Sequence, residues 1–227
     1  MPKFYILEAA IGAGKSTLLD ILERLLKRQG KRVTIIPEPI DVWEKTGALE
    51  AFYADVSGQS YAFQTFAFAT RCQRVRQVVQ ANPDTEIFLM ERSVVSDRYL
   101  FARMLQRDGK FTPLQSLMYE EWAGLWTSIL PFAQPDGFIY LAPSLDATLE
   151  RIENRGRKGE HVPPEYQQDL IDHHEVIFGC GIGSMDQVVA VTEISGAPVP
   201  VLRIYSDADY RSDDNHEVLQ KIIRFIQ

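Results

Sequence analysis

The stretch FYIL (4–7), followed after Glu8 by AAIGAGKST (9–17), decides the fold of this chain. The four apolar residues predict a buried strand, and the pattern from Lys15 onward predicts a helix. Gly14, Lys15 and Ser16 match the second half of Gly-x-x-x-x-Gly-Lys-[Ser/Thr], a loop whose backbone amides surround a polyphosphate while the lysine reaches its phosphates and the hydroxyl binds Mg²⁺. A plain strand-to-helix turn would explain the glycines, but not their coincidence with the lysine and the hydroxyl. We therefore predict a phosphate-binding loop at the start of a helix, whose dipole adds positive potential.

Ala9 stands where this pattern has its first glycine. If the backbone there requires a positive φ, a Cβ costs about 1–2 kcal/mol, whereas at an ordinary φ alanine is harmless. We expect an ordinary φ, because the close approach to phosphate falls mainly on Gly12 and Gly14.

Composition and charge narrow the class of protein. The 227 residues, 45% of them hydrophobic, fit one globular domain over 1–227. A net charge of −7 argues against nucleic acid as a partner, and the sequence has no run of 18 apolar residues that would span a membrane. The first apolar run is too short for a signal peptide, and Cys72 and Cys180 lack metal-ligand spacing. We expect reduced thiols and a cytoplasmic location.

Strand and helix patterns alternate along the chain. Short apolar runs predict buried strands at 4–7, 33–36, 87–90, 138–141 and 200–205. Helical patterns occupy 15–29, 45–54, 60–81, 96–107, 114–130, 144–155, 164–178 and 215–227. This order predicts an α/β fold with a parallel sheet covered on both faces. The segment 179–198, rich in Gly, Ser and Ala, is expected to be a loop, and we assign it no role.

Two charged motifs follow predicted strands. In PEPIDVW (37–43), two prolines hold Glu38 at the carboxyl end of a strand, the edge of an α/β sheet where ligands bind and where a carboxylate can accept a hydroxyl proton. Taken alone, such a glutamate is more often a solvated turn residue. In ERSVVSDRYLF (91–101), Glu91 lies where a carboxylate can hold Mg²⁺. Helix capping would explain Ser96 or Asp97, but not the two arginines beside them.

A third motif, RIENRGRKGEH (151–161), places three arginines next to two glycines. A solvated helix end is the simpler interpretation of such a cluster. The glycines favour instead a mobile lid over about 151–161, whose arginines neutralise charge during phosphoryl transfer.

In combination, these motifs resemble the deoxynucleoside kinases, the family of the deoxycytidine, deoxyguanosine and insect-type deoxynucleoside kinases. The resemblance rests on GAGKST, PEPxxxW, FQT with an arginine seven residues after the glutamine, ERSxxSDRYxF and RxxxRGRxxE, over about 3–178 and 200–210. It implies a P-loop kinase fold with a five-stranded parallel sheet, helices on both faces and a mobile lid. It also implies ATP as phosphate donor, Mg²⁺, a deoxynucleoside substrate and a homodimer.

The resemblance implies roles for residues of the donor and reaction sites. Glu38 would be the general base for the 5′-hydroxyl, and Arg92 would contact the 5′-oxygen and the base. Ser16 and Glu91 would bind Mg²⁺, and Asp209 and Tyr210 would lie at the donor adenine. The triphosphate would be bound by the loop residues Ile11, Gly12, Ala13, Gly14, Lys15, Ser16 and Thr17. The remaining catalytic charges would come from Lys15 and the lid residues Arg151, Arg155 and Arg157.

The resemblance implies a nucleoside site as well. Trp43 and Phe63 would be the walls of the base slot, Gln64 would pair with the base edge, and Tyr53 with Glu160 would bind the 3′-hydroxyl. The full implied set is Glu38, Trp43, Tyr53, Phe63, Gln64, Ala67, Arg71, Arg92, Asp97, Phe101, which would lie under the deoxyribose, and Glu160. Members with an Arg–Asp pair like Arg71 and Asp97 are those that take deoxycytidine or purine deoxynucleosides, so we expect these substrates rather than thymidine.

The expected function is therefore transfer of the γ-phosphate of ATP to the 5′-hydroxyl of a deoxyribonucleoside, in nucleotide salvage. One alternative is a nucleoside monophosphate kinase, which would need a basic pocket for the acceptor's phosphate. Another is a non-catalytic nucleotide sensor in which Ala9 marks a weakened loop.

Overall fold

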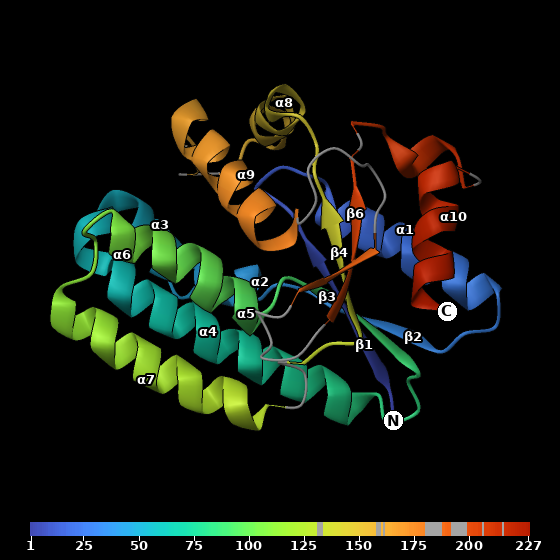
Figure 1. The fold of residues 1–227 in the computed structure, drawn as a ribbon, viewed down its shortest axis with the longest axis horizontal. Coiled ribbons are helices and arrows are strands. Elements are labelled where there is room, and N and C mark those ends of the chain that lie inside the picture. Colours follow the sequence, from blue (N-terminus) through green and yellow to red (C-terminus); the bar gives the residue numbers. More distant parts are fainter. Residues whose placement is uncertain are drawn as a thin grey trace.

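The computed structural model describes residues 1–130, 134–157, 160, 162–179, 188–191, 199–205, 207–214 and 216–227. They form one sheet of six strands in the order β2-β3-β1-β4-β6-β5 (Figure 1). The strands are β1 (Lys3–Glu8), β2 (Val33–Ile36), β3 (Ile87–Glu91), β4 (Gly137–Leu141), β5 (Val188–Val191) and β6 (Val199–Ile204). All pairs except β5–β6 are parallel, which confirms the predicted α/β fold and its five parallel strands.

Strand β5 corrects the expectation of a loop over 179–198. It pairs antiparallel with β6, with Val188 opposite Leu202 and Val191 opposite Val199. A run of four residues, VVAV, is too short to show a period, and only its pairing with β6 makes it a strand. Residues 180–187 and 192–198 lie outside the described part.

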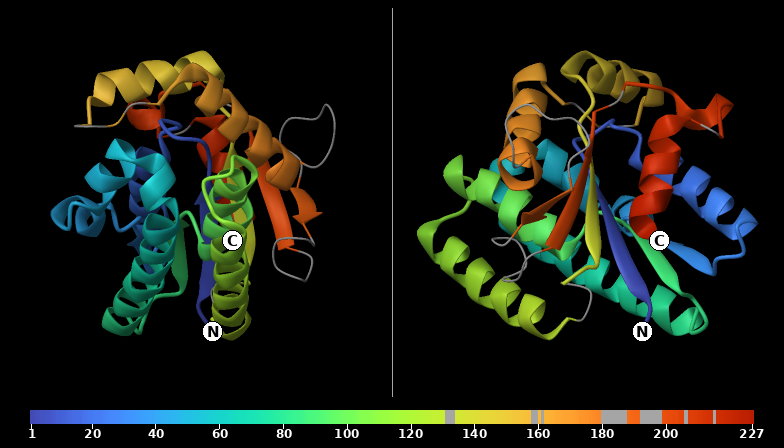
Figure 2. Two further views of the ribbon diagram at one scale, coloured as in Figure 1. Left: turned by 90° about the vertical axis from the view of Figure 1, so that its left-hand side faces the viewer. Right: turned by 45° about the vertical axis from the view of Figure 1, so that its right-hand side comes forward.

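The helices cover both faces of the sheet (Figure 2). They are α1 (Lys15–Arg28), α2 (Ile40–Lys45), α3 (Ala48–Ala54), α4 (Val56–Ala81), α5 (Val94–Ser96), the π-helical turn η1 (Asp97–Ala102), α6 (Arg103–Arg107), α7 (Pro113–Ile129), α8 (Leu145–Arg155), α9 (Pro164–Phe178), the short 3₁₀ turn η3 (Tyr210–Ser212) and α10 (Glu217–Ile226).

The predicted helix over 45–54 is wrong in its extent, because α2 ends at Lys45 and a separate helix, α3, begins at Ala48. Gly47 separates them with a φ of 72°, a left-handed conformation that breaks a helix. Helix α4 begins at Val56, before the predicted residue 60, because the Asp55 carboxylate accepts from the Gly58 amide at 2.9 Å and caps the first turn.

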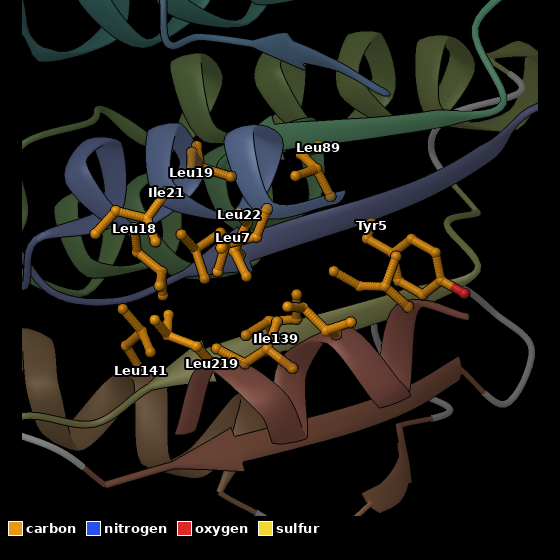
Figure 3. Close-up of a cluster of buried hydrophobic side chains, with 14 of the residues drawn as sticks. Tyr5, Leu7, Leu18, Leu19, Ile21, Leu22, Leu89, Ile139, Leu141 and Leu219 are labelled. Atoms are coloured by element: carbon orange, nitrogen blue, oxygen red, sulfur yellow. The ribbon is translucent and has the colours of Figure 1, made fainter. Parts of the chain in front are cut away.

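One core layer lies between the sheet and the helices α1 and α10 (Figure 3). Leu18, Leu19 and Leu22 of α1 are 1% exposed or less, and they pack on Leu7 and Leu89 of the sheet. These leucines recur at the helical spacing that the sequence showed, so this face of α1 holds the phosphate-binding loop against β1.

The other core layer is aromatic and packs the opposite face of the sheet. It brings the sheet residues Phe88 and Phe138 together with Phe68 of α4, Tyr119 of α7 and Phe178 of α9. No helix among the described residues has the length and apolarity that crossing a membrane requires.

The carboxyl ends of three neighbouring parallel strands meet at one edge of the sheet. β1 ends at Glu8 and β3 at Glu91, and Glu38 follows β2 by two residues. Because Leu7 is in register with Glu91, these three acidic residues share the edge that faces the phosphate-binding loop.

Candidate active site

A cavity of about 560 Å³ opens at this edge. Every residue predicted for the nucleoside lines it, together with Ile11, Gly12, Lys15 and Ser16 of the phosphate-binding loop, Glu91, and the lid residues Arg155 and Arg157. Ala13, Gly14, Thr17, Arg151, Asp209 and Tyr210 do not line it. The structure therefore joins the predicted acceptor site and the start of the predicted phosphate site in one space.

The phosphate-binding loop takes its shape from two glycines. Gly12 and Gly14 have φ values of 75° and 89°, and Gly14 precedes the first turn of α1. A Cβ on Gly12 would lie 2.5 Å from the Thr148 carbonyl oxygen and 2.7 Å from Cγ1 of Ile152, both on α8. Among the described residues, Arg92 is the only non-glycine with a positive φ, so Ala9 has the ordinary φ that we expected.

Lys15 and Ser16 point to the inside of the site. The buried Lys15 Nζ donates to the Ala10 carbonyl at 3.1 Å, and burial, with repulsion from Arg92, lowers its pKa to about 8. Ser16 Oγ donates to the Glu91 carboxylate at 3.0 Å. A hydroxyl and a carboxylate are the hard oxygen donors that Mg²⁺ prefers, so these two side chains fit such an ion. No group of three or more His, Cys, Asp or Glu side chains that could hold a metal occurs in the described part.

Arg71 of α4 connects three polar groups of the cavity. Its guanidinium donates to Asp97 from Nε at 2.7 Å, to Glu38 at 2.8 Å and to the Glu91 carbonyl at 3.1 Å. Burial alone would raise the pKa of Glu38, but the charges of Arg71, Arg92 and Lys15 together hold it below its ordinary value. Glu38 is thus ionised at neutral pH.

Arg92 lies between two carboxylates. Its Nε is 3.7 Å from Glu38 Oε1, its Nη1 is 3.9 Å from Glu8 Oε2, and its guanidinium lies 4.8 Å above the Phe101 ring. Its φ of 60° is left-handed, which costs a non-glycine residue about 1–3 kcal/mol and directs the side chain into the site.

Glu8 was not predicted as a site residue. It is fully buried, and burial raises the pKa of its carboxyl to about 7 although Arg92 opposes the shift. The signal was present in the sequence, since a charged residue ends an otherwise apolar strand directly before the loop.

Aromatic side chains form the far wall. Trp43 and Phe63 meet edge to face at 5.5 Å, and the Trp43 indole donates to Thr70 Oγ1 at 2.8 Å, which fixes its ring. Phe52, which was not predicted, stacks on Phe63 at 4.6 Å. Gln64 beside them is 5% exposed, and its Oε1 has no hydrogen-bond partner among the described residues. An unpaired amide oxygen in an aromatic slot is suited to a planar ligand that brings a donor.

The lid arginines divide into two groups. Arg155 donates to the Glu160 carboxylate at 2.6 Å, and Arg157 lies 3.7 Å from it. Arg151 instead donates to the Ala13 carbonyl at 3.3 Å and to the Asp207 carbonyl at 2.8 Å, behind the phosphate-binding loop. Burial, with the charge of Glu160, raises the pKa of Tyr53 to about 12, so the phenol stays neutral beside that carboxylate. Lys158, Gly159 and His161 of the predicted lid are outside the described residues.

The two residues predicted for the donor adenine lie outside this cavity. Asp209 accepts from Arg211 and caps η3, and Tyr210 packs in the core layer of α1 and α10. Further lining residues that sequence reasoning missed are Ile40, Leu49, Phe52, Val56, Leu105, Lys110, Val162, Pro163 and Tyr166. Most are apolar residues within helical patterns, where nothing in the sequence separates a cavity wall from a core.

Ala9→Gly tests the loop. Ala9 is fully buried and has an ordinary φ, so the substitution adds freedom to the unfolded chain and also removes a buried methyl group. We expect a loss of at least about 0.4–1 kcal/mol in the free energy of unfolding with unchanged ATP affinity. Urea unfolding and calorimetric titration with ATP measure both, and a clear gain in ATP affinity would contradict the expectation.

Glu8→Gln tests the buried carboxyl. A folded pKa of about 7 against an ordinary 4.5 means that the folded chain binds this proton more tightly, a stabilisation complete below about pH 4.5 and lost as the pH rises through 7. Glutamine has no proton to lose. Relative to wild type, the free energy of unfolding of the variant should therefore rise by roughly 2–4 kcal/mol between these pH values.

Urea unfolding of both proteins from about pH 5 to pH 9 measures this difference. The exposed Glu50→Gln is the control and should show no such trend. A Glu8→Gln difference that is flat with pH would show that the carboxyl has an ordinary pKa.

Known proteins resemble this chain over most of its length. The model of the family described as "Deoxynucleoside kinase" matches residues 6–227. A probable deoxycytidine kinase from Fowlpox virus is 31% identical over 97% of this chain and 86% of its own. Deoxycytidine kinase 2 from Gallus gallus is 28% identical over 91% of this chain and 83% of its own, and a mitochondrial deoxyguanosine kinase from Xenopus laevis is 28% identical over 96% and 88%. The chain belongs to the deoxynucleoside kinase family and is a phosphotransferase of the nucleoside kinase type.

Proposed function

We propose that this chain transfers the γ-phosphate of ATP to the 5′-hydroxyl of a deoxyribonucleoside bound in the cavity. The observation that carries the proposal is the place of Glu38 and Arg92. This carboxylate and guanidinium are 3.7 Å apart and line one cavity together with the phosphate-binding loop and the aromatic slot. A nucleoside with its base in the slot would present its 5′-oxygen to both groups.

Glu38 accepts the hydroxyl proton as the bond to phosphorus forms. The hydroxyl is a weak acid, so positioning and charge neutralisation account for most of the rate. Lys15 reaches the phosphates, and Arg92 with the lid arginines offsets the charge that grows on the transferred group. Ser16 and Glu91 would hold Mg²⁺, which when bound neutralises phosphate charge and orients the γ-phosphate.

The nucleoside is recognised by polar side chains that line the cavity. Tyr53 and Glu160 bind the 3′-hydroxyl, and the free Gln64 oxygen accepts from an amino group of the base. The Arg71–Asp97 pair lies at the base edge and occupies space that the thymine methyl would need. We therefore propose deoxycytidine or a purine deoxynucleoside as substrate.

The charge balance of the cavity favours a nucleoside over a nucleoside monophosphate. Arginines that line it face carboxylates: Arg71 faces Asp97 and Glu38, Arg92 faces Glu38 and Glu8, and Arg155 faces Glu160. An acceptor phosphate bound by Arg71 or Arg155 would have to break such a pair, and at Arg92 it would lie close to two carboxylates. A weakened loop, as in a sensor, is not supported by the ordinary φ of Ala9.

An apolar stripe on α7 supports the homodimer. Exposed apolar side chains recur there at helical spacing: Leu114, Leu117, Met118, Leu125, Trp126 and Ile129. Water-facing stripes of this length mark protein interfaces, and we propose a second copy of the chain as the partner. We further propose a single-domain enzyme that acts in nucleotide salvage in the cytoplasm.

Assays with ATP, Mg²⁺ and a panel of nucleosides and monophosphates test the function directly. We expect phosphorylation of deoxycytidine, deoxyadenosine or deoxyguanosine, weaker phosphorylation of thymidine, and none of the monophosphates. Activity on monophosphates alone would refute the proposal.

Glu38→Gln tests the base. Glutamine retains the size and an acceptor for Arg71 but cannot take the proton. We expect kcat to fall about 10²–10⁴-fold with nucleoside affinity largely retained, as measured by steady-state kinetics and calorimetry. The exposed Glu50→Gln on α3 is the control. A loss below about fivefold would show that Glu38 is not the base.

The pair Arg71 and Asp97 tests base choice. Arg71→Met leaves Asp97 buried without its cation and also removes a partner of Glu38, so it should be more harmful than Asp97→Ala, after which Arg71 still contacts Glu38 and the Glu91 carbonyl. The double variant should leave an apolar wall that accepts the thymine methyl.

The measurement is kcat/KM for deoxycytidine, deoxyadenosine, deoxyguanosine and thymidine on wild type and all three variants. We expect both single variants to lose activity on the native substrate and the double variant to gain activity on thymidine. A wild type that already prefers thymidine would overturn this interpretation of the pair.

A further inference from the structure

Glu8 lies against Arg92, is not among the residues that line the cavity, and takes no part in the reaction proposed above. It ends β1, its side chain is fully buried, and its Oε1 accepts from Ser93 Oγ at 3.1 Å. Its other oxygen, Oε2, has no hydrogen-bond partner in the described part of the chain. Burial of a carboxylate with one oxygen unpaired is unfavourable, so the fold keeps this group at a cost to stability.

The unpaired oxygen faces an unpaired donor. Nη1 of Arg92 lies 3.9 Å from it and likewise has no hydrogen-bond partner among the described residues. On its other side the same guanidinium is 3.7 Å from Glu38. Both distances are longer than a hydrogen bond allows, so Arg92 lies between two carboxylates and forms a hydrogen bond with neither.

Neighbouring residues hold Arg92 in this position between the two carboxylates. The Arg92 amide donates to the Leu7 carbonyl at 3.1 Å, so its backbone is fixed to β1 directly beside Glu8. Phe101 covers one face of the guanidinium. Lys15 from α1 and Arg71 from α4 are the other cations whose charges act on Glu8. Arg71 is occupied by Asp97 and Glu38, and Lys15 by loop carbonyls.

We propose that Glu8 is a positioning residue for Arg92: its charge opposes that of Glu38 across the guanidinium and keeps Arg92 open toward the 5′-oxygen. This inference rests on the proposed function, in which Arg92 and Glu38 act on that oxygen. Without the charge on Glu8, Arg92 would move the short distance to a hydrogen bond with Glu38. Glu38 and Arg92 would then bind each other and would no longer interact with the 5′-oxygen of the substrate.

The test is made at about pH 8.5, above the Glu8 pKa of about 7, so that the wild-type carboxyl is ionised. It compares Glu8→Gln, which removes the charge at constant size, with Glu8→Asp, which retains it. The control is Glu175→Gln, which removes a carboxylate paired with Arg203 at 2.8 Å outside the cavity. For Glu8→Gln we expect kcat to fall about tenfold to a hundredfold, with KM for nucleoside and ATP changed less than about threefold. Glu8→Asp should retain more of kcat than Glu8→Gln, and the control should match wild type.

A double-mutant cycle with Arg92→Gln isolates the path of the effect. If Glu8 acts through Arg92, adding Glu8→Gln to Arg92→Gln should change kcat by less than about twofold in single-turnover assays. Multiplicative losses in the double variant would overturn the inference. So would an unchanged kcat in Glu8→Gln, or equal losses in both Glu8 variants accompanied by a lower Tm.

The wild-type assay separates the two proposals. A wild type inactive on every nucleoside would refute the proposed function and this inference with it. An active wild type with a fully active Glu8→Gln variant would refute only the inference.

Discussion

The site depends on a balance of buried charge at the edge of the sheet. Parallel strands deliver Glu8, Glu38 and Glu91 to one place, and three acidic side chains cannot all remain ionised there without cations. Arg71 and Arg92 supply that charge from α4 and from the turn after β3. Arg71 is bonded to two carboxylates and Arg92 lies within 4 Å of two, so both arginines act on Glu38.

Under the proposed function, this arrangement links substrate choice to chemistry. Arg71 is bonded to both Asp97 and Glu38, the residues that we propose meet the base edge and the reacting hydroxyl. A change at Asp97 would therefore also alter the electrostatics at Glu38. Glu160 contacts Arg155 and Arg157 and lies beside Tyr53, so the groups proposed to bind the sugar contact those proposed to neutralise phosphate charge.

How much of the fold and of the site could be predicted from the sequence depends on how far apart in the chain the interacting residues are. The five parallel strands and the phosphate-binding loop depend on local patterns, and they were predicted. Trp43, Gln64 and Glu160 could be named because the motifs resemble those of a known family, and all three line the cavity. Glu8 was missed because its role depends on its contact with Arg92, which is 84 positions away in the chain. Phe52 was missed because one aromatic residue in a helix resembles any core residue. Strand β5 was missed because four residues become a strand only through β6.

The contact of Gly12 with α8 limits the substitutions that the phosphate-binding loop can accept. The space that a side chain at residue 12 would need is taken by the Thr148 carbonyl and by Ile152. The glycine is thus required by the helix that carries the lid arginines, independently of any phosphate. Variation in the loop and variation in α8 are coupled, and a redesigned donor site that places a larger residue at position 12 must first move that helix or shorten Ile152.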